Sequence, residues 1–259
     1  MNTIATQPGE TTAHQSEQSG LLWGSEAILK GALESEYAVD QLITPAAEPF
    51  RAVLSASRDE TFASVLREHG TSITTTPDAR RAVTLAEFEA RSGRTAFAMV
   101  PNNQLELSMA ALQEAASIEL PLGAALGVFL ENHPYLNPAS DPLQVAKSLN
   151  IGCVVPSTIQ QLRGAIEWGE RLSRAARSLV ALVVHRSLLQ SADSIVLRPN
   201  REDFSVDVLT ADRRRRRRRV SETGGLLRVA RRLELNRAVS MPNPGERVPV
   251  GFVVVGPAD

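Results

Sequence analysis

The sequence has little cysteine and no long hydrophobic run. Its 259 residues contain one cysteine, Cys153, so no disulfide can form within the chain and no cysteine-ligated iron–sulfur cluster can be held by it. Cys153 lies in an apolar segment, which favours core packing over reactivity. No apolar run approaches the ~20 residues of a membrane span, and residues 1–20 lack the apolar centre of a signal peptide. We therefore expect a cytoplasmic protein without a membrane segment.

Lysine is also scarce, and the basic residues gather late in the chain. The two lysines are Lys30 and Lys147. Between Arg198 and Arg237 there are 13 arginines and 6 acidic residues, whereas the rest of the sequence has 15 basic and 23 acidic residues. The tract Arg213–Arg219 could neutralise nucleic-acid phosphates, but no aromatic residue interleaves it and arginine is the ordinary base of this chain. A solvated connector is favoured, and nucleic acid is not expected as a partner.

Apolar strands alternate with amphipathic helices through the middle of the sequence. Continuous apolar runs at Thr95–Val100, Gly123–Leu130 and Leu179–His185 predict strands that are buried on both faces. Helical spacing of apolar residues predicts helices at Leu105–Ile118 and Ser157–Arg177. This alternation predicts an α/β fold of the doubly wound type, with a mainly parallel sheet and helices on both faces.

The segment Leu21–Glu48 contains the junction around which we expect the fold to be organised. A helix is expected over Ser25–Ser35 and a strand over Ala38–Ile43, followed by the turn Thr44-Pro45. In an open parallel sheet, ligands bind beyond the carboxyl ends of the strands, where free backbone N–H groups favour an anion. The pattern therefore predicts that Thr44 presents a free hydroxyl at a ligand site.

Three more elements are expected after this junction. Residues 49–69 have mixed helical spacing and predict a helix that is interrupted near its middle. Thr71–Thr75 is β-branched and predicts a strand, and Pro77–Ala90 predicts a helix with Thr76 available as its cap. Asp78 lies in the first turn of that helix, where the macrodipole favours an acid.

Short motifs spread over the chain resemble those of one protein family. They are Gly24-Ser25-Glu26-Ala27-Ile28, Gly31-Ala32-Leu33-Glu34, Ile43-Thr44-Pro45-Ala46-Ala47-Glu48, Ser92–Met99, Asp141–Lys147, Val155-Pro156-Ser157 and Ala181–Ser187. The first three resemble the G-N-E-A-I-A-x-G-A-L-E helix and the Y-P-x-T-P-S-S-E turn of the thiamine-diphosphate-dependent 2-oxoacid:ferredoxin oxidoreductases, most closely the indolepyruvate type. The resemblance implies the fold of that family's pyrimidine-binding domain.

Composition and this resemblance together predict four segments. Residues 1–20 are polar and are expected to form a disordered tail. Residues 21–200 are expected to form the pyrimidine-binding-like α/β domain, and residues 201–246 a basic connector that contains a helix. Residues 247–259 resemble the first strand of the family's next domain, the rest of which is absent from the sequence.

The resemblance also implies a set of cofactor contacts. In this family a glutamate of the pyrimidine-binding domain bonds the aminopyrimidine ring of thiamine diphosphate, and the motif places Asp78 at that position, one methylene shorter. Contacts with the cofactor are implied for Thr44, Pro45, Asn102 and Asn103. Asp78 could equally be an ordinary helix-start acid, and the two asparagines could only satisfy a strand–helix turn.

The diphosphate half of such a site has no counterpart in the sequence. The family holds magnesium through a G-D-G motif, and no Gly-Asp pair occurs here. The resemblance therefore implies that thiamine diphosphate and magnesium bind only in complex with a diphosphate-binding partner. The expected partners are such a chain, a second copy of this chain, or both, and an active complex would use a 2-oxoacid such as pyruvate or indolepyruvate as substrate. The alternative is a non-catalytic homologue that acts as an assembly or regulatory partner. His133 has no partner at metal-ligand spacing, so no metal site is expected in the chain.

Overall fold

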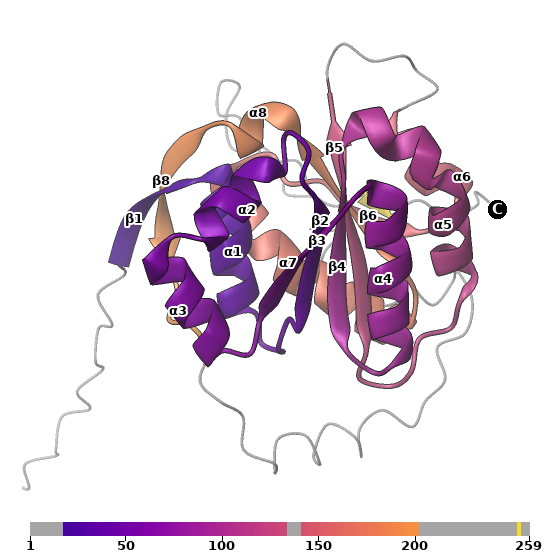
Figure 1. Ribbon diagram of the computed structural model, residues 1–259, viewed down its shortest axis with the longest axis horizontal. Helices are drawn as coiled ribbons and strands as arrows, with labels where there is room; N and C mark the ends of the chain where they lie inside the picture. The colour runs from indigo at the N-terminus through magenta and orange to yellow at the C-terminus, as the bar shows by residue number, and fades with distance from the viewer. Residues whose placement is uncertain (1–17, 134–140, 202–252, 255–259) are drawn as a thin grey trace, which may run out of the picture.

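The computed structural model describes residues 18–133, 141–201 and 253–254 (Figure 1). The arginine tract Arg213–Arg219, and with it the expected connector helix, lies outside these residues. No helix of the described part is long and apolar enough to cross a membrane.

The centre of the fold is a seven-stranded sheet in the order β3-β2-β4-β5-β7-β6-β9. The strands are β2 (Gln41–Pro45), β3 (Ser72–Thr76), β4 (Thr95–Val100), β5 (Ala125–Asn132), β6 (Gly152–Val154), β7 (Val180–His185) and β9 (Val253–Val254). All neighbouring pairs from β3 to β6 are parallel, and β9 pairs antiparallel with β6. Figure 1 shows helices on both sides of this sheet, which confirms the predicted doubly wound α/β fold.

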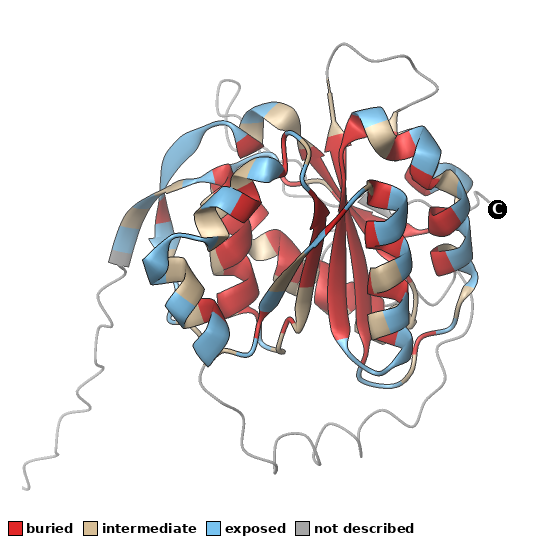
Figure 2. Ribbon diagram, in the orientation of Figure 1, coloured by how far each residue is buried: buried red, intermediate tan, exposed pale blue. Residues whose placement is uncertain are grey.

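Two helical layers cover the sheet. One layer contains α1 (Gly24–Glu34), α2 (Arg51–Ser57), α3 (Glu60–Glu68), α7 (Ile159–Ala176) and α8 (Arg186–Leu189). The other contains α4 (Ala79–Arg91), α5 (Leu105–Ser117) and α6 (Pro142–Ser148). Successive residues of a strand point to opposite faces, so in β4 Phe97 packs under the first layer and Ala96 and Ala98 under the second. Figure 2 shows the resulting buried sheet between half-exposed helices.

A second, two-stranded sheet was not predicted from the sequence. It pairs β1 (Gln18–Trp23) antiparallel with β8 (Ala192–Leu197), and its inner side packs on Ala27 and Ile159. The strand β1 starts inside the segment predicted to be a polar tail, because its partner comes from the far end of the domain and pairing orders it.

Differences from the expected boundaries at two elements bear on the predicted site. β2 covers Gln41–Pro45 rather than Ala38–Ile43, because its pairing with β3 and β4 starts at Gln41. α4 starts at Ala79, and its N-cap is Asp78 rather than Thr76. The hydroxyl of Thr76 instead donates to the backbone oxygen of Asp78 at 2.9 Å.

Candidate functional site

The carboxyl ends of the parallel strands meet at one edge of the sheet. Thr44 and Pro45 end β2, Asp78 follows β3, and Asn102 and Asn103 follow β4. The register places Pro45 opposite Thr76, the last residue of β3. The structure therefore brings all five predicted site residues to the same edge.

Asp78, for which the resemblance implies a cofactor contact, is the N-cap of α4. Its Oδ1 accepts a hydrogen bond of 2.8 Å from the backbone N of Arg81. Its Oδ2 makes no hydrogen bond with another described residue. Asp78 is half-buried in the wall of an open pocket of about 680 Å³, which Arg80, Arg81, Thr84, Leu85 and Phe88 also line. One oxygen of this carboxylate is thus used by the fold, and the other remains for a ligand.

Thr44 does not present a free hydroxyl, so that prediction is wrong. The residue is fully buried, and its Oγ1 donates to the backbone oxygen of Pro45 at 3.0 Å. The reason is that β2 continues through Pro45, which places Thr44 inside the strand rather than in the turn after it. Pro45 is also buried.

The turn after β4 contacts the start of α4 at this edge. Its residues Asn102–Gln104 form the short 3₁₀ helix η1. Asn103 is exposed, whereas Asn102 is buried. The side-chain oxygen of Gln104 accepts a hydrogen bond of 2.7 Å from the backbone N of Ala79, the residue after Asp78. Asp78 and the asparagine turn are therefore held side by side.

Glu131 is a buried carboxylate at this edge that the sequence analysis did not identify. It lies at the carboxyl end of β5 and is 2% exposed. Its Oε2 accepts a hydrogen bond of 2.8 Å from the backbone N of Asn102, and its Oε1 lies 3.5 Å from Nη1 of Arg186. The sequence feature that could have identified Glu131 is its place directly after the apolar run Ala125–Leu130. An acid at the end of a buried strand needs a hydrogen-bond or charged partner, because burial of an unpaired charge is costly.

No protein-family model and no curated protein sequence matches the chain. Among solved structures, it is similar to the 2-oxoglutarate:ferredoxin oxidoreductase from Magnetococcus marinus, determined with 2-oxoglutarate, coenzyme A and succinyl-CoA bound. The TM-score is 0.55 and the identity 14%, over 74% of this chain and 35% of that chain. A split-gene transketolase, an inactive β4 tetramer, is similar at a TM-score of 0.45 and 15% identity, over 71% of this chain and 52% of that one.

The likeness to the oxidoreductase concerns the fold. The chain spans about a third of the length of that protein, since the match covers 35% of it. The described α/β unit thus shares its fold with one part of that oxidoreductase.

Proposed function

We propose that this chain is a subunit or remnant of a thiamine-diphosphate-dependent 2-oxoacid:ferredoxin oxidoreductase and contributes the aminopyrimidine half of the cofactor site. The observation that carries the proposal is the placement of Asp78. It lies at the carboxyl edge of a parallel sheet, beside an open pocket, with Oδ2 outside the helix cap. The motifs of the sequence and the fold likeness support the same assignment, with a 2-oxoacid of the pyruvate or indolepyruvate kind as substrate.

The residues at this edge fit the cofactor in part. Asp78 would accept a hydrogen bond from the ring nitrogen through Oδ2, and the exposed Asn103 belongs to the adjoining turn, whose Gln104 is bonded to Ala79. Thr44 and Pro45 are buried and would shape the floor without polar contact. When bound, thiamine diphosphate supplies the nucleophilic carbon and the electron sink for 2-oxoacid cleavage. Asp78 would favour the imino tautomer of the ring by holding a proton at that nitrogen.

We expect a second chain to cover the open side of the Asp78 pocket. Phe88, on α4, lines this pocket and is 64% exposed, and Leu107, on the neighbouring α5, is 55% exposed. Exposed apolar side chains on α4 and the neighbouring α5 form a surface that a partner would cover. We expect this partner to be a diphosphate-binding chain with the Gly-Asp-Gly motif that this sequence does not contain.

The test uses the aminopyrimidine fragment of the cofactor, 4-amino-5-hydroxymethyl-2-methylpyrimidine. Titration of the full chain, followed by ¹H–¹⁵N NMR, should give saturable shifts of the amides of Arg81 and Asn103, with a dissociation constant of about 1 mM or weaker. Asp78→Asn keeps an N-cap oxygen but removes the carboxylate, and it should abolish these shifts. Asp78→Glu should strengthen binding if the shorter side chain reaches the ring poorly.

A matched control variant is Asp59→Asn. Asp59 caps α3 in the same way, because its side chain accepts from the backbone N of Thr61 at 3.0 Å. This variant should bind the fragment like the parent chain. Equal binding by Asp78→Asn, or no saturable shift at all, would remove the assignment.

A non-catalytic homologue that acts in assembly or regulation is the second candidate. The specific observations in its favour are that Oδ1 of Asp78 is engaged in the cap of α4 and that the Thr44 hydroxyl donates inward. Absence of fragment binding, combined with unchanged folding, would favour this function.

A further inference from the structure

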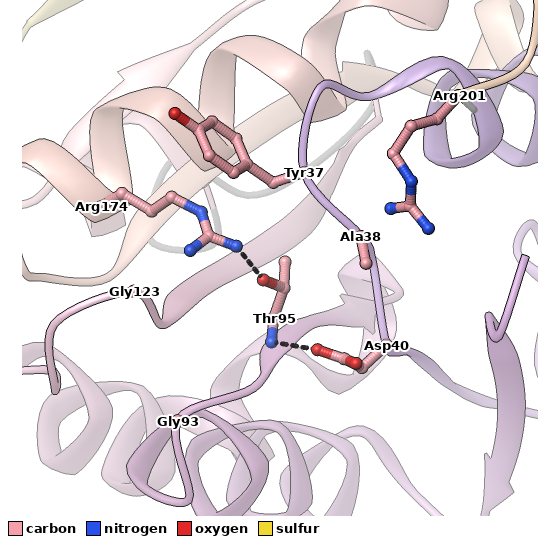
Figure 3. Close-up of a pocket in the computed structure, with 8 residues that line it drawn as sticks. All are labelled: Tyr37, Ala38, Asp40, Gly93, Thr95, Gly123, Arg174 and Arg201. Atoms are coloured by element: carbon pink, nitrogen blue, oxygen red, sulfur yellow. Dashed lines mark hydrogen bonds between the residues drawn. The ribbon is translucent and has the colours of Figure 1, made fainter. Parts of the chain in front are cut away.

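A second pocket lies at the opposite, amino-terminal edge of the sheet (Figure 3). It has a volume of about 310 Å³ and lies among the starts of β2, β4 and β5. Its polar lining comes from Tyr37, Asp40, Thr95, Arg174 and Arg201. A strand of six residues such as β4 spans roughly 20 Å, so this pocket is separate from the Asp78 edge.

Arg174 is held rigidly in the wall of this pocket. Its Nε and Nη2 donate to Oε1 of the buried Glu170 at 3.0 and 2.8 Å, and its Nη2 also donates to Oγ1 of Thr95 at 2.5 Å. The guanidinium carbon lies 4.5 Å from the ring centroid of Tyr37. Nη1 donates no hydrogen bond to a described residue. A nearly buried guanidinium whose Nη1 has no acceptor among the described residues is preorganised to donate hydrogen bonds to an anion.

The remaining walls suit a small ligand with one anionic group. Arg201 also lines the pocket, and Figure 3 shows the segment from Tyr37 to Asp40 running between its side chain and that of Arg174. The backbone N of Arg201 donates to the oxygen of Leu33 at 2.8 Å, and its Nη2 donates to the backbone oxygen of His69 at 3.3 Å. The carboxylate of Asp40 is engaged, since its Oδ2 accepts from the backbone N of Thr95 at 2.7 Å. Gly93 and Gly123 add no side chains, and at both the backbone has a φ of +90°.

We propose that this pocket binds a small organic anion, whose carboxylate or phosphate group accepts from Nη1 of Arg174 and is attracted by the charge of Arg201, and whose apolar part contacts Tyr37 and Ala38. The pocket volume of about 310 Å³ is at the lower end of the range for small-molecule sites, which favours a small ligand. The proposal does not depend on the proposed function, because no residue of the Asp78 edge lines this pocket.

Glu170 couples this site to pH. It lies behind Arg174 and is fully buried, and its Oε2 accepts from the hydroxyl of Ser35. Burial raises the pKa of Glu170 to about 7, although Arg174, the Ser35 hydroxyl and the more distant Arg201 oppose this shift. The ionised carboxyl cancels the charge of Arg174, and the protonated carboxyl leaves that charge for the ligand. Anion affinity therefore rises as the pH falls, and by reciprocity a bound anion raises the pKa of Glu170.

The experiment is an NMR titration of the full chain with acetate, benzoate and inorganic phosphate, at constant ionic strength set with chloride. We expect saturable shifts of the amides of Gly93, Thr95 and Gly123 with a dissociation constant of about 1 mM or tighter for at least one probe. Stronger binding of benzoate identifies a carboxylate ligand with an apolar part, and stronger binding of phosphate identifies a phosphate ester. No saturable shift with any probe overturns the proposal.

Variants separate a built site from general surface charge. Arg201→Gln removes one guanidinium from a half-buried residue outside the helices, and it should weaken binding at least about five-fold. Arg94→Gln is the matched control, because exposed Arg94 lies between Gly93 and Thr95 but pairs with Glu89 at 2.9 Å and does not line the pocket. Equal weakening by both variants would overturn the proposal.

A last pair of measurements tests the coupling. The affinity of the parent chain for the better carboxylate probe, whose charge is constant in this range, should fall about three-fold or more from pH 6 to pH 8, across the Glu170 pKa of about 7. Glu170→Gln should bind with the same affinity at both pH values, with its fold checked by circular dichroism. A parent affinity that is flat with pH would exclude a role of Glu170 in anion binding.

Discussion

The carboxyl of Glu170 makes the stability of the fold depend on pH. The group is fully buried, and burial raises its pKa from the ordinary value of 4.5 to about 7. Because the pKa in the folded state lies above that in the unfolded chain, its contribution to stability is complete below about pH 4.5. That contribution is lost as the pH rises through about 7.

Glu170→Gln should remove this pH dependence. The shift from 4.5 to about 7 corresponds to on the order of 3 kcal/mol of unfolding free energy, which the parent chain should lose between pH 4.5 and pH 8. Glutamine keeps an acceptor for Arg174 and does not ionise, so this loss should be absent. Urea unfolding at pH 5, 6, 7 and 8 measures the difference. Glu119→Gln is the control, because Glu119 is largely exposed, and it should follow the parent curve; a Glu170→Gln curve parallel to the parent's would contradict the assignment.

At the scale of elements, the contact between α1 and α7 depends on one glycine. An added Cβ at Gly31 would lie 2.2 Å from the backbone oxygen of Arg163. A backbone atom cannot move aside as a flexible side chain does, so the two helices would have to separate. This close approach lets α1 and α7 share one layer on the same face of the sheet.

Gly31→Ala should therefore destabilise the protein by about 1–3 kcal/mol, measured by thermal or urea unfolding. Gly164→Ala on α7 is the matched control, because its added Cβ would meet only the Trp168 side chain, at 3.3 Å. That variant should stay within about 1 kcal/mol of the parent, since alanine is the better helix former. Similar stabilities of the two variants would show that α1 and α7 can move apart at little cost.

At the scale of the whole molecule, the chain alone should not bind thiamine diphosphate with magnesium. The diphosphate carries most of the charge of that cofactor, and the sequence has no Gly-Asp pair to hold the metal. Isothermal titration of the full chain, at a salt concentration of about 0.15 M to screen the arginines, should show no heat beyond dilution. Addition of a diphosphate-binding partner should restore binding. A micromolar affinity of the chain alone would mean that it holds the diphosphate by other residues.

The sequence by itself determined the elements of the central sheet and its covering helices, and the edge at which the predicted site residues gather. β4 was predicted with its observed bounds and α5 to within one residue, because apolar periodicity over a short window reflects which faces are buried. The gathering of Thr44, Asp78 and Asn103 at one edge followed from parallel strands alone, since their carboxyl ends must coincide.

Only the tertiary structure decided contacts between distant segments. β1 pairs with β8, and the backbone N of Asn102 donates to Glu131, although the local sequence of neither partner indicates the other. The burial of the Thr44 hydroxyl likewise depends on how far β2 extends in the packed sheet. The pocket around Arg174 is assembled from several separate segments, and the raised pKa of Glu170 exists because packing removes water from its carboxyl. The burial of a side chain and the identity of its hydrogen-bond partners depend on the packing of distant segments, so they cannot be read from a short stretch of sequence.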